Sequence, residues 1–130
     1  MVESVKPEEP LAHYILEKSY YRSSDNTVKP HAFMLPAGKD EISVFRTISL
    51  SETEIWQIGI TYVSEKRGKP LLGRAELIAK DVTSLGLDVK PDPVPHPRHA
   101  NITGFPHGDS EKTRMFAVEL AARATLHLVK

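Results

Sequence analysis

The stretch of sequence that decides the fold is ISVFRTISLSETEIWQIGITYVSEKRG, residues 42–68. Its first nine residues alternate between two kinds of side chain, with Ile42, Val44 and Ile48 on one face and Arg46 among them. An apolar alternation with a period of two is typical of a strand that buries one face. We therefore predict a strand over 42–49.

The second part of the same stretch predicts a helix. Ser51 and Glu54 have the spacing of a capping box, in which the serine hydroxyl accepts from the amide three residues on and the glutamate accepts from the serine amide. Apolar residues then recur at intervals of three and four, and Gly68 supplies a C-terminal stop. These signals predict a helix over about 51–67.

Working outward, the chain alternates short extended segments with one more long helix. The last helix is expected over about 109–128, because apolar residues there follow a helical stripe. Together the elements indicate an α+β fold: a single domain over 11–130 with a small, curved, mostly antiparallel sheet packed by two main helices. Residues 1–10 are expected to form a flexible N-terminal lead-in. Further strands are expected over 11–21, 32–35, 71–79, 87–89 and 98–105.

Composition excludes several functions. Among the 130 residues, 17 basic side chains balance 17 acidic ones, so strong nucleic-acid binding is not expected. The chain has no cysteine, which excludes disulfides and thiolate metal sites. No apolar run approaches 18 residues and no signal-peptide pattern is present, so we expect a cytoplasmic protein without a membrane partner. A chain of this length needs no cofactor for stability, and none is predicted.

One segment is unusually rich in proline. The stretch KPDPVPHP, residues 90–97, has proline at every second position. Each proline fixes its own backbone and restricts the residue before it, so this segment is expected to be stiff and extended. Because proline cannot donate to a ladder, it cannot be an interior strand.

The densest group of reactive side chains follows directly, in HPRHANITGFPHGD, residues 96–109. On a strand, His99 and Asn101 share a face while Arg98 points the other way. An imidazole can act as general acid or base near neutral pH, so His99, His107 and Asn101 are the candidate catalytic residues. The alternative is that these histidines bond the backbone or face solvent. Prolines disturb any regular spacing of the first histidines, and no metal site is predicted.

Candidate ligand-binding residues are Arg46, Arg98 and His99, since guanidinium groups bind phosphate or carboxylate. A charge on the apolar face of a strand must be paired or lie at the edge of the core. The alternative for Arg46 is thus an ion pair with Glu76 or Glu41 at the rim of the sheet. Arg74 and Glu76 are expected on the hydrated surface, and Trp56 is expected to anchor the core.

Several segments resemble a family of small uncharacterised bacterial proteins, and this resemblance implies no activity. A strand ending in Phe45-Arg46, a helix closing at glycine and a later strand with His99 are also similar to the opening of compact ADP-ribosyltransferase-like folds. The catalytic glutamate of such folds has no counterpart on a strand, since Glu111 and Glu119 fall in the expected last helix. The segments that resemble the bacterial family are VKPHAFMLP (28–36), SVFRT (43–47), LSETEIWQIG (50–59), GRAEL (73–77), GLDVKPD (86–92), RHANITGFP (98–106) and ELAARATL (119–126).

Two functions are compatible with these observations. The first is an accessory or regulatory protein that binds another protein through Arg46, Arg98 and His99. The second is a small enzyme or binding protein for a nucleotide or phosphorylated ligand, with His99 as acid or base and the two arginines as anion binders. Convergence of Arg46, His99 and His107 on one pocket would favour the second, whereas scattered or solvated positions would exclude a site built from these three residues.

Overall fold

The computed structural model describes residues 3–129, and Met1, Val2 and Lys130 lie outside the described part. It confirms the α+β class: a six-stranded sheet has the order β6-β7-β4-β1-β5-β8, and every pairing in it is antiparallel. A separate two-stranded ribbon joins β2 and β3. The strands are β1 (Pro10–Ile15), β2 (Tyr21–Arg22), β3 (Thr27–Val28), β4 (Ile42–Arg46), β5 (Gly73–Ile78), β6 (Asp88–Pro91), β7 (His99–Thr103) and β8 (Thr125–Leu128).

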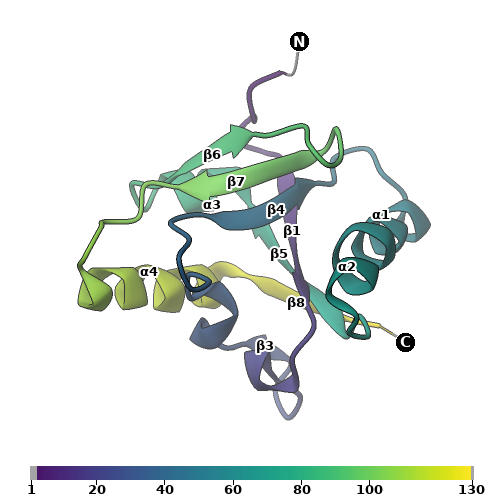
Figure 1. Ribbon diagram of the computed structural model, residues 1–130, viewed down its shortest axis with the longest axis horizontal. Coiled ribbons are helices and arrows are strands. Elements are labelled where there is room, and N and C mark those ends of the chain that lie inside the picture. Colours follow the sequence, from purple (N-terminus) through teal and green to yellow (C-terminus); the bar gives the residue numbers. More distant parts are fainter. Residues whose placement is uncertain (1–2, 130) are drawn as a thin grey trace.

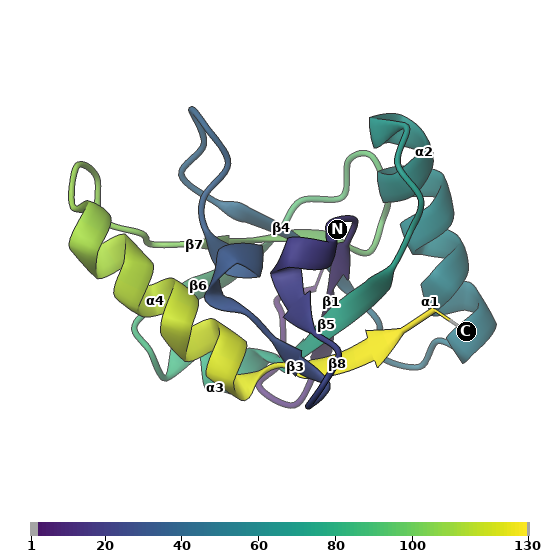
Figure 2. The ribbon, with the colours of Figure 1, turned by 90° about the horizontal axis from the view of Figure 1, so that it is seen from below.

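Helices cover both faces of the sheet (Figures 1 and 2). The first helix is continuous but changes its winding: α1 (Glu52–Gly59) passes through a π-helical turn at Ile60–Ser64 into α2 (Glu65–Arg67). We call this whole segment, 52–67, the first helix. The short α3 (Ala79–Thr83) follows β5, and α4 (Ser110–Arg123) lies on the opposite face from the first helix. Short 3-10 turns span Lys18–Tyr20 and Pro30–Phe33.

The two faces bury separate apolar clusters. The larger lies under α4 and includes Leu11, Phe33 and Val44, each without exposed surface. The smaller lies under the first helix and consists of Ala12, Tyr14, Phe45, Ile55 and Ile58. The sheet thus separates the main core, on the α4 side, from a smaller apolar cluster on the side of the first helix.

The predicted start and end of the first helix are confirmed. Ser51 Oγ accepts from Glu54 N at 3.2 Å, and Glu54 Oε1 accepts from Ser51 N at 3.0 Å. Gly68 ends the helix in the left-handed region, with φ of 64°. Gly59 allows a close approach, since a Cβ there would lie 2.5 Å from Cδ1 and Cε1 of the Tyr14 ring.

Two predicted elements are wrong. The last helix ends at Arg123, not near 128, because residues 125–128 instead form the edge strand β8 beside β5. Residues 32–35 are not a strand, because Pro30 begins a 3-10 turn that buries Phe33 beneath α4. The proline-rich segment 90–97 is extended only at its start, where Lys90 and Pro91 belong to the outermost strand β6, as a position outside the sheet interior requires. The prediction that the whole segment is extended is wrong, because residues 92–98 form the turn that reverses the chain into the antiparallel strand β7.

The lead-in expected over 1–10 lies partly outside the described residues. Within the described part, Glu9 has only 2% of its surface exposed and Pro10 is the first residue of β1. Earlier residues also contact the domain: Val5 packs against the main core, and Pro7 O accepts from Lys80 N. Within the described residues, the lead-in is therefore packed against the domain.

Candidate functional site

A pocket of about 470 Å³ opens where three neighbouring strands meet the C-terminal half of the first helix. We call it the His99 pocket. The residues that line it come from β1, β4, β7, the first helix and two loops, and they are His13, Tyr14, Lys39, Ser43, Phe45, Tyr62, Val63, Lys66, Arg67, Pro95 and His99.

The register of the sheet brings the polar floor of this pocket together. Strands β4 and β7 pair so that Ser43 lies opposite Asn101 and Phe45 lies opposite His99. Residues opposite each other in an antiparallel pair project to the same face. Ser43 and His99 are therefore diagonal neighbours on one face, although 56 positions separate them along the chain.

Both ring nitrogens of His99 have a partner. Nε2 lies 2.6 Å from Ser43 Oγ, and Nδ1 lies 2.9 Å from the main-chain oxygen of Asp92. The Asp92 carboxylate is 3.6 Å from Nδ1 and accepts a hydrogen bond from Asn101 Nδ2 at 3.1 Å. The Phe45 ring packs edge-on against the imidazole, with centroids 5.2 Å apart. These contacts fix the ring in one orientation.

Two further histidines lie close to this floor. Burial lowers the pKa of His13, against the opposing effect of the Ser43 and Ala32 carbonyls, which its ring nitrogens approach at 3.0 and 2.8 Å. Burial also lowers the pKa of His96, with the Arg98 charge and His99 adding to the effect. His96 stacks edge-on with Tyr62 and accepts from Arg98 N through Nδ1. Both shifts favour neutral imidazoles, although the His13 ring lies on the side of the main core, where it stacks on Phe33.

The rim of the His99 pocket is positively charged. Lys39, Lys66 and Arg67 are exposed, and none of their side chains forms an ion pair or hydrogen bond with any residue in 3–129. None of the residues lining the pocket is acidic. Unpaired cations above an aromatic floor are suited to a small anion that carries a ring.

Arg46 is not part of this pocket. Its Nε and Nη2 donate to the two carboxylate oxygens of Glu9 at 2.8 Å each, and it also donates to the main-chain oxygens of Glu3 and Ser4. The expected partners Glu76 and Glu41 are therefore wrong, because the segment before β1 crosses the end of β4 and supplies the carboxylate. Hydrogen bonding to Arg46 lowers the pKa of Glu9.

The other candidates are also dispersed. Arg98 donates through Nη1 to Ile48 O at 2.7 Å and lines a smaller hollow beside Arg46. His107 leaves 85% of its side chain exposed in the turn before α4, 3.6 Å from Asp40. Asn101 is not a lining residue of the pocket, and its side chain donates to the Asp92 carboxylate. Arg46, His99 and His107 thus do not surround one pocket.

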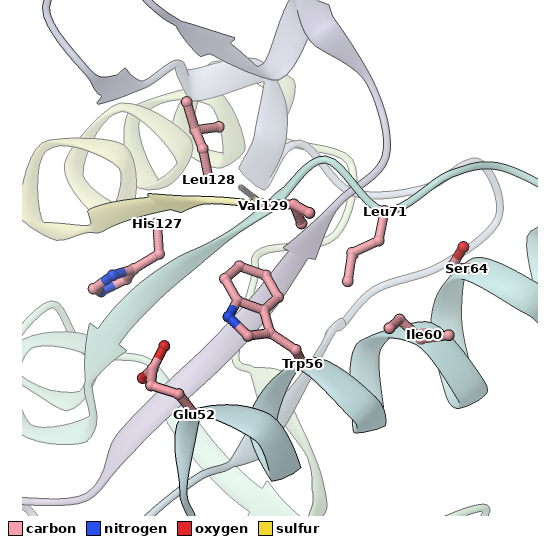
Figure 3. A pocket seen from close by; sticks show the side chains of 8 residues that line it. All are labelled: Glu52, Trp56, Ile60, Ser64, Leu71, His127, Leu128 and Val129. Carbon is pink, nitrogen blue, oxygen red and sulfur yellow. The ribbon is translucent and has the colours of Figure 1, made fainter.

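A larger hollow, about 780 Å³, lies between the first helix and the edge strand β8, and we call it the α1–β8 groove (Figure 3). Its walls are mostly apolar, and Figure 3 shows the Trp56 ring pointing from α1 towards β8. The lining residues are Glu52, Trp56, Ile60, Ser64, Leu71, His127, Leu128 and Val129.

The position of Arg74, beneath Trp56 beside the α1–β8 groove, shows that one prediction is wrong. Arg74 is not on the hydrated surface but has 2% of its surface exposed. Its guanidinium carbon lies 4.6 Å from the Trp56 ring centroid, and its two terminal nitrogens donate to the Glu52 carboxylate at 3.1 and 2.8 Å. Trp56 itself is only half-buried, so it covers Arg74 rather than anchoring a core.

No group of three or more His, Asp or Glu residues between 3 and 129 is arranged to hold a metal ion. Among the same residues, no helix has the length and apolarity needed to cross a bilayer.

The His99 pocket and the α1–β8 groove give this α+β protein a cationic pocket and an apolar groove. Comparisons with protein-family models, with curated proteins and with solved structures found no match.

Sequence reasoning missed the serine and the three cations of the His99 pocket. Ser43 stands on the mixed face of the predicted strand, and its partner is set by the pairing of β4 with β7. Lys66 and Arg67 were visible only as a basic helix end, and Lys39 as part of a turn. The signal that could have found the two helical cations is the basic last turn before Gly68, but the side on which they lie is set by the π-helical turn at Ile60–Ser64, which changes the phase of the helix.

Proposed function

We propose that the protein binds a small anionic ligand with an aromatic or heterocyclic ring, of which a nucleotide is the type, in the His99 pocket. The observation that carries this proposal is the set of three unpaired cations over a floor of Phe45 and Tyr62, with no acidic lining residue. Lys and Arg supply charge-assisted hydrogen bonds to phosphate, and aromatic rings stack on bases. A volume of about 470 Å³ is within the range of small-molecule sites.

This proposal retains His99, which the sequence suggested for a site that binds a phosphorylated ligand, but it assigns the anion to other cations than Arg46 and Arg98. Arg46 spends four of its five donors on Glu9 and main-chain carbonyls, and its charge is paired with Glu9, so it is not available as the anion binder of the His99 pocket. Arg98 lies by the smaller hollow. Lys39, Lys66 and Arg67 take over that role.

The test is thermal unfolding with ATP as the probe and inorganic phosphate as the ring-free arm. ATP at 100 times its dissociation constant should add about 2.7 kcal/mol to the free energy of unfolding. The double variant Lys66→Ala/Arg67→Ala should bind ATP at least about 10-fold more weakly, since each charged hydrogen bond contributes more than 1 kcal/mol.

The matched control removes one lysine and one arginine elsewhere, in Lys18→Ala/Arg114→Ala, where both side chains are exposed. It should bind ATP as the unmodified protein does. Failure of ATP to stabilise the protein, or equal loss in both double variants, would refute the proposal. Equal stabilisation by inorganic phosphate would show that the base of ATP adds nothing to binding, and would refute the proposed stacking on Phe45 and Tyr62.

A second candidate is the protein-binding role, favoured by the α1–β8 groove. We propose as its occupant an extended segment of a partner that pairs with β8 and places an apolar side chain against Trp56. Strand β8 is an edge of the sheet, and edges accept added strands. The adjoining wall is formed by Ile60, Leu71 and Val129, of which Ile60 and Val129 are 40% and 47% exposed.

Trp56 is the only tryptophan in the chain, so its fluorescence reports on the α1–β8 groove directly. Peptides selected from a displayed random library should carry alternating apolar residues and shift Trp56 emission to shorter wavelength. Trp56→Ala should weaken their binding at least about 10-fold, because a buried aromatic side chain is a typical hot spot. Val118→Ala, on the exposed surface of α4, should not. Selected peptides that bind Trp56→Ala as tightly as the unmodified protein would exclude this groove as the docking site.

A further inference from the structure

We propose that Ser43 is a nucleophile activated by His99, and that the His99 pocket hydrolyses a carboxylic ester through an acyl-serine intermediate. A nucleophile and a base within hydrogen-bond reach, with the base oriented by a third group, is the arrangement that activates a hydroxyl. Here the three groups are Ser43 Oγ, the His99 imidazole and the main-chain oxygen of Asp92, joined by distances of 2.6 and 2.9 Å.

The proton positions follow from the partners of the imidazole. The oxygen of a main-chain carbonyl only accepts, so the ring nitrogen that faces Asp92 O, Nδ1, carries the proton of the neutral imidazole. Nε2 then has a free lone pair. Ser43 is therefore the donor in the 2.6 Å contact with Nε2. This is the direction in which a general base removes a hydroxyl proton.

The imidazole is held while the hydroxyl stays accessible. His99 has 8% of its surface exposed, whereas Ser43 is exposed and lines the pocket. The Phe45 ring packs edge-on against the imidazole, and Asp92 O accepts from Nδ1. Asn101 Nδ2 donates to the Asp92 carboxylate and so positions this residue. Both reacting side chains stand on strands of the sheet, which gives a more precise geometry than loops would.

The reaction balances without a metal or redox partner. Ser43 Oγ forms a bond to the carbonyl carbon of the ester while its proton passes to His99 Nε2. The carbon–oxygen bond to the alcohol breaks, and the alcohol leaves with that proton. Water then attacks the acyl-serine, giving its proton to Nε2, and the carboxylic acid leaves as Ser43 recovers a proton. The net change is ester plus water to acid plus alcohol.

The substrate class rests on the proposed function of the same pocket. An ester whose molecule also carries a phosphate or a free carboxylate would place that anion at Lys39, Lys66 and Arg67, which line the same hollow as Ser43. The reactivity of Ser43 rests on separate evidence, namely its geometry with His99, so the two can be tested apart.

The experiment is labelling with diisopropyl fluorophosphate, an uncharged probe. Ser43 Oγ bonds to phosphorus, fluoride leaves, and the proton passes to His99. Peptide mapping by mass spectrometry should find one labelled serine, at position 43, and no label in Ser43→Ala. His99→Gln should label at least about 100-fold more slowly, because general-base help contributes at least that factor.

Three controls decide the result. Asp88→Asn changes an exposed carboxylate on β6 that does not line the His99 pocket, and it should label within about threefold of the unmodified protein. Lys18→Ala/Arg114→Ala removes one lysine and one arginine at exposed positions outside the pocket and should label at the full rate. Thermal unfolding confirms that Ser43→Ala is folded, as expected for an exposed position.

Absence of label on Ser43 in the folded protein, or an unchanged rate in His99→Gln, overturns the nucleophile. If Ser43 is unlabelled while ATP stabilises the protein, the ester chemistry fails and the anion site stands. If Ser43 is labelled while ATP has no effect, the anion site fails and the nucleophile stands.

Discussion

Replacing Arg46 with alanine should lower the free energy of unfolding at pH 7 by about 3–5 kcal/mol, the cost of leaving one member of a buried ion pair without its partner. The side chains of Arg46 and Glu9 are 10% and 3% exposed, and two parallel hydrogen bonds of 2.8 Å join them. Alanine would leave the Glu9 carboxylate buried with one donor, the amide of Lys6. Urea unfolding of both proteins measures the difference.

The matched control is the exposed pair of Arg22 and Asp25, whose side chains are 58% and 49% exposed. Arg22→Ala should cost less than about 1 kcal/mol, since solvent screens such pairs. The double variant Arg46→Met/Glu9→Leu should recover much of the loss, because apolar replacements strand no charge. A cost for Arg46→Ala as small as that for Arg22→Ala would show that residues before β1 do not hold this arginine.

The Arg46 variant should also have a distinct pH dependence. Arg46 lowers the pKa of Glu9 below its ordinary value of 4.5, so the stability that this carboxylate contributes is present above pH 4.5. It is lost as the pH falls through the lowered pKa. Without Arg46, burial raises the pKa of Glu9, and protonation then favours the folded state. The penalty of Arg46→Ala should therefore shrink as the pH is lowered from 7 towards 4, measured as unfolding free energy at each pH.

Phe33→Ala is the second change with a large expected effect, about 3–5 kcal/mol of unfolding free energy, because it removes a whole ring from the main core. Phe33 has no exposed surface and lies in the 3-10 turn that packs against α4. Its ring also stacks on His13 with centroids 5.1 Å apart, so the substitution removes support from one wall of the His99 pocket.

Two control substitutions, measured by the same urea unfolding, test whether the loss comes from the buried ring. Phe33→Leu should cost less than about 1.5 kcal/mol, since it conserves most of the apolar volume. Met34→Ala removes a side chain from a residue that is 38% exposed and should change little. Equal effects of Phe33→Ala and Met34→Ala would contradict the assigned core.

Local signals in the sequence predicted the elements that depend on local chemistry. The capping box at Ser51 and Glu54 located the first helix, and Gly68 located its end. Alternation located β4, and the prolines kept β6 at the edge of the sheet. Each of these signals acts within a few residues, and so a single sequence contains the whole argument.

What the sequence could not predict depends on partners far along the chain. Residues 125–128 are apolar enough to continue a helix, and only pairing with β5, about fifty residues earlier, makes them a strand. The Glu9 partner of Arg46 is 37 positions away. His99 was a candidate by type, but Ser43 acquires its chemistry only when the register of β4 and β7 places it beside the imidazole.

The first helix, which contains the π-helical turn at Ile60–Ser64, lines the His99 pocket on one side and the α1–β8 groove on the other. Beyond α1, Tyr62, Lys66 and Arg67 line the His99 pocket, while Trp56, Ile60 and Ser64 line the α1–β8 groove. The first helix is thus a shared wall of both hollows. A ligand in one hollow that displaces this wall would change affinity in the other, and thermodynamic reciprocity requires the same factor in both directions. Measuring ATP affinity with and without a groove-bound peptide would give that coupling free energy directly.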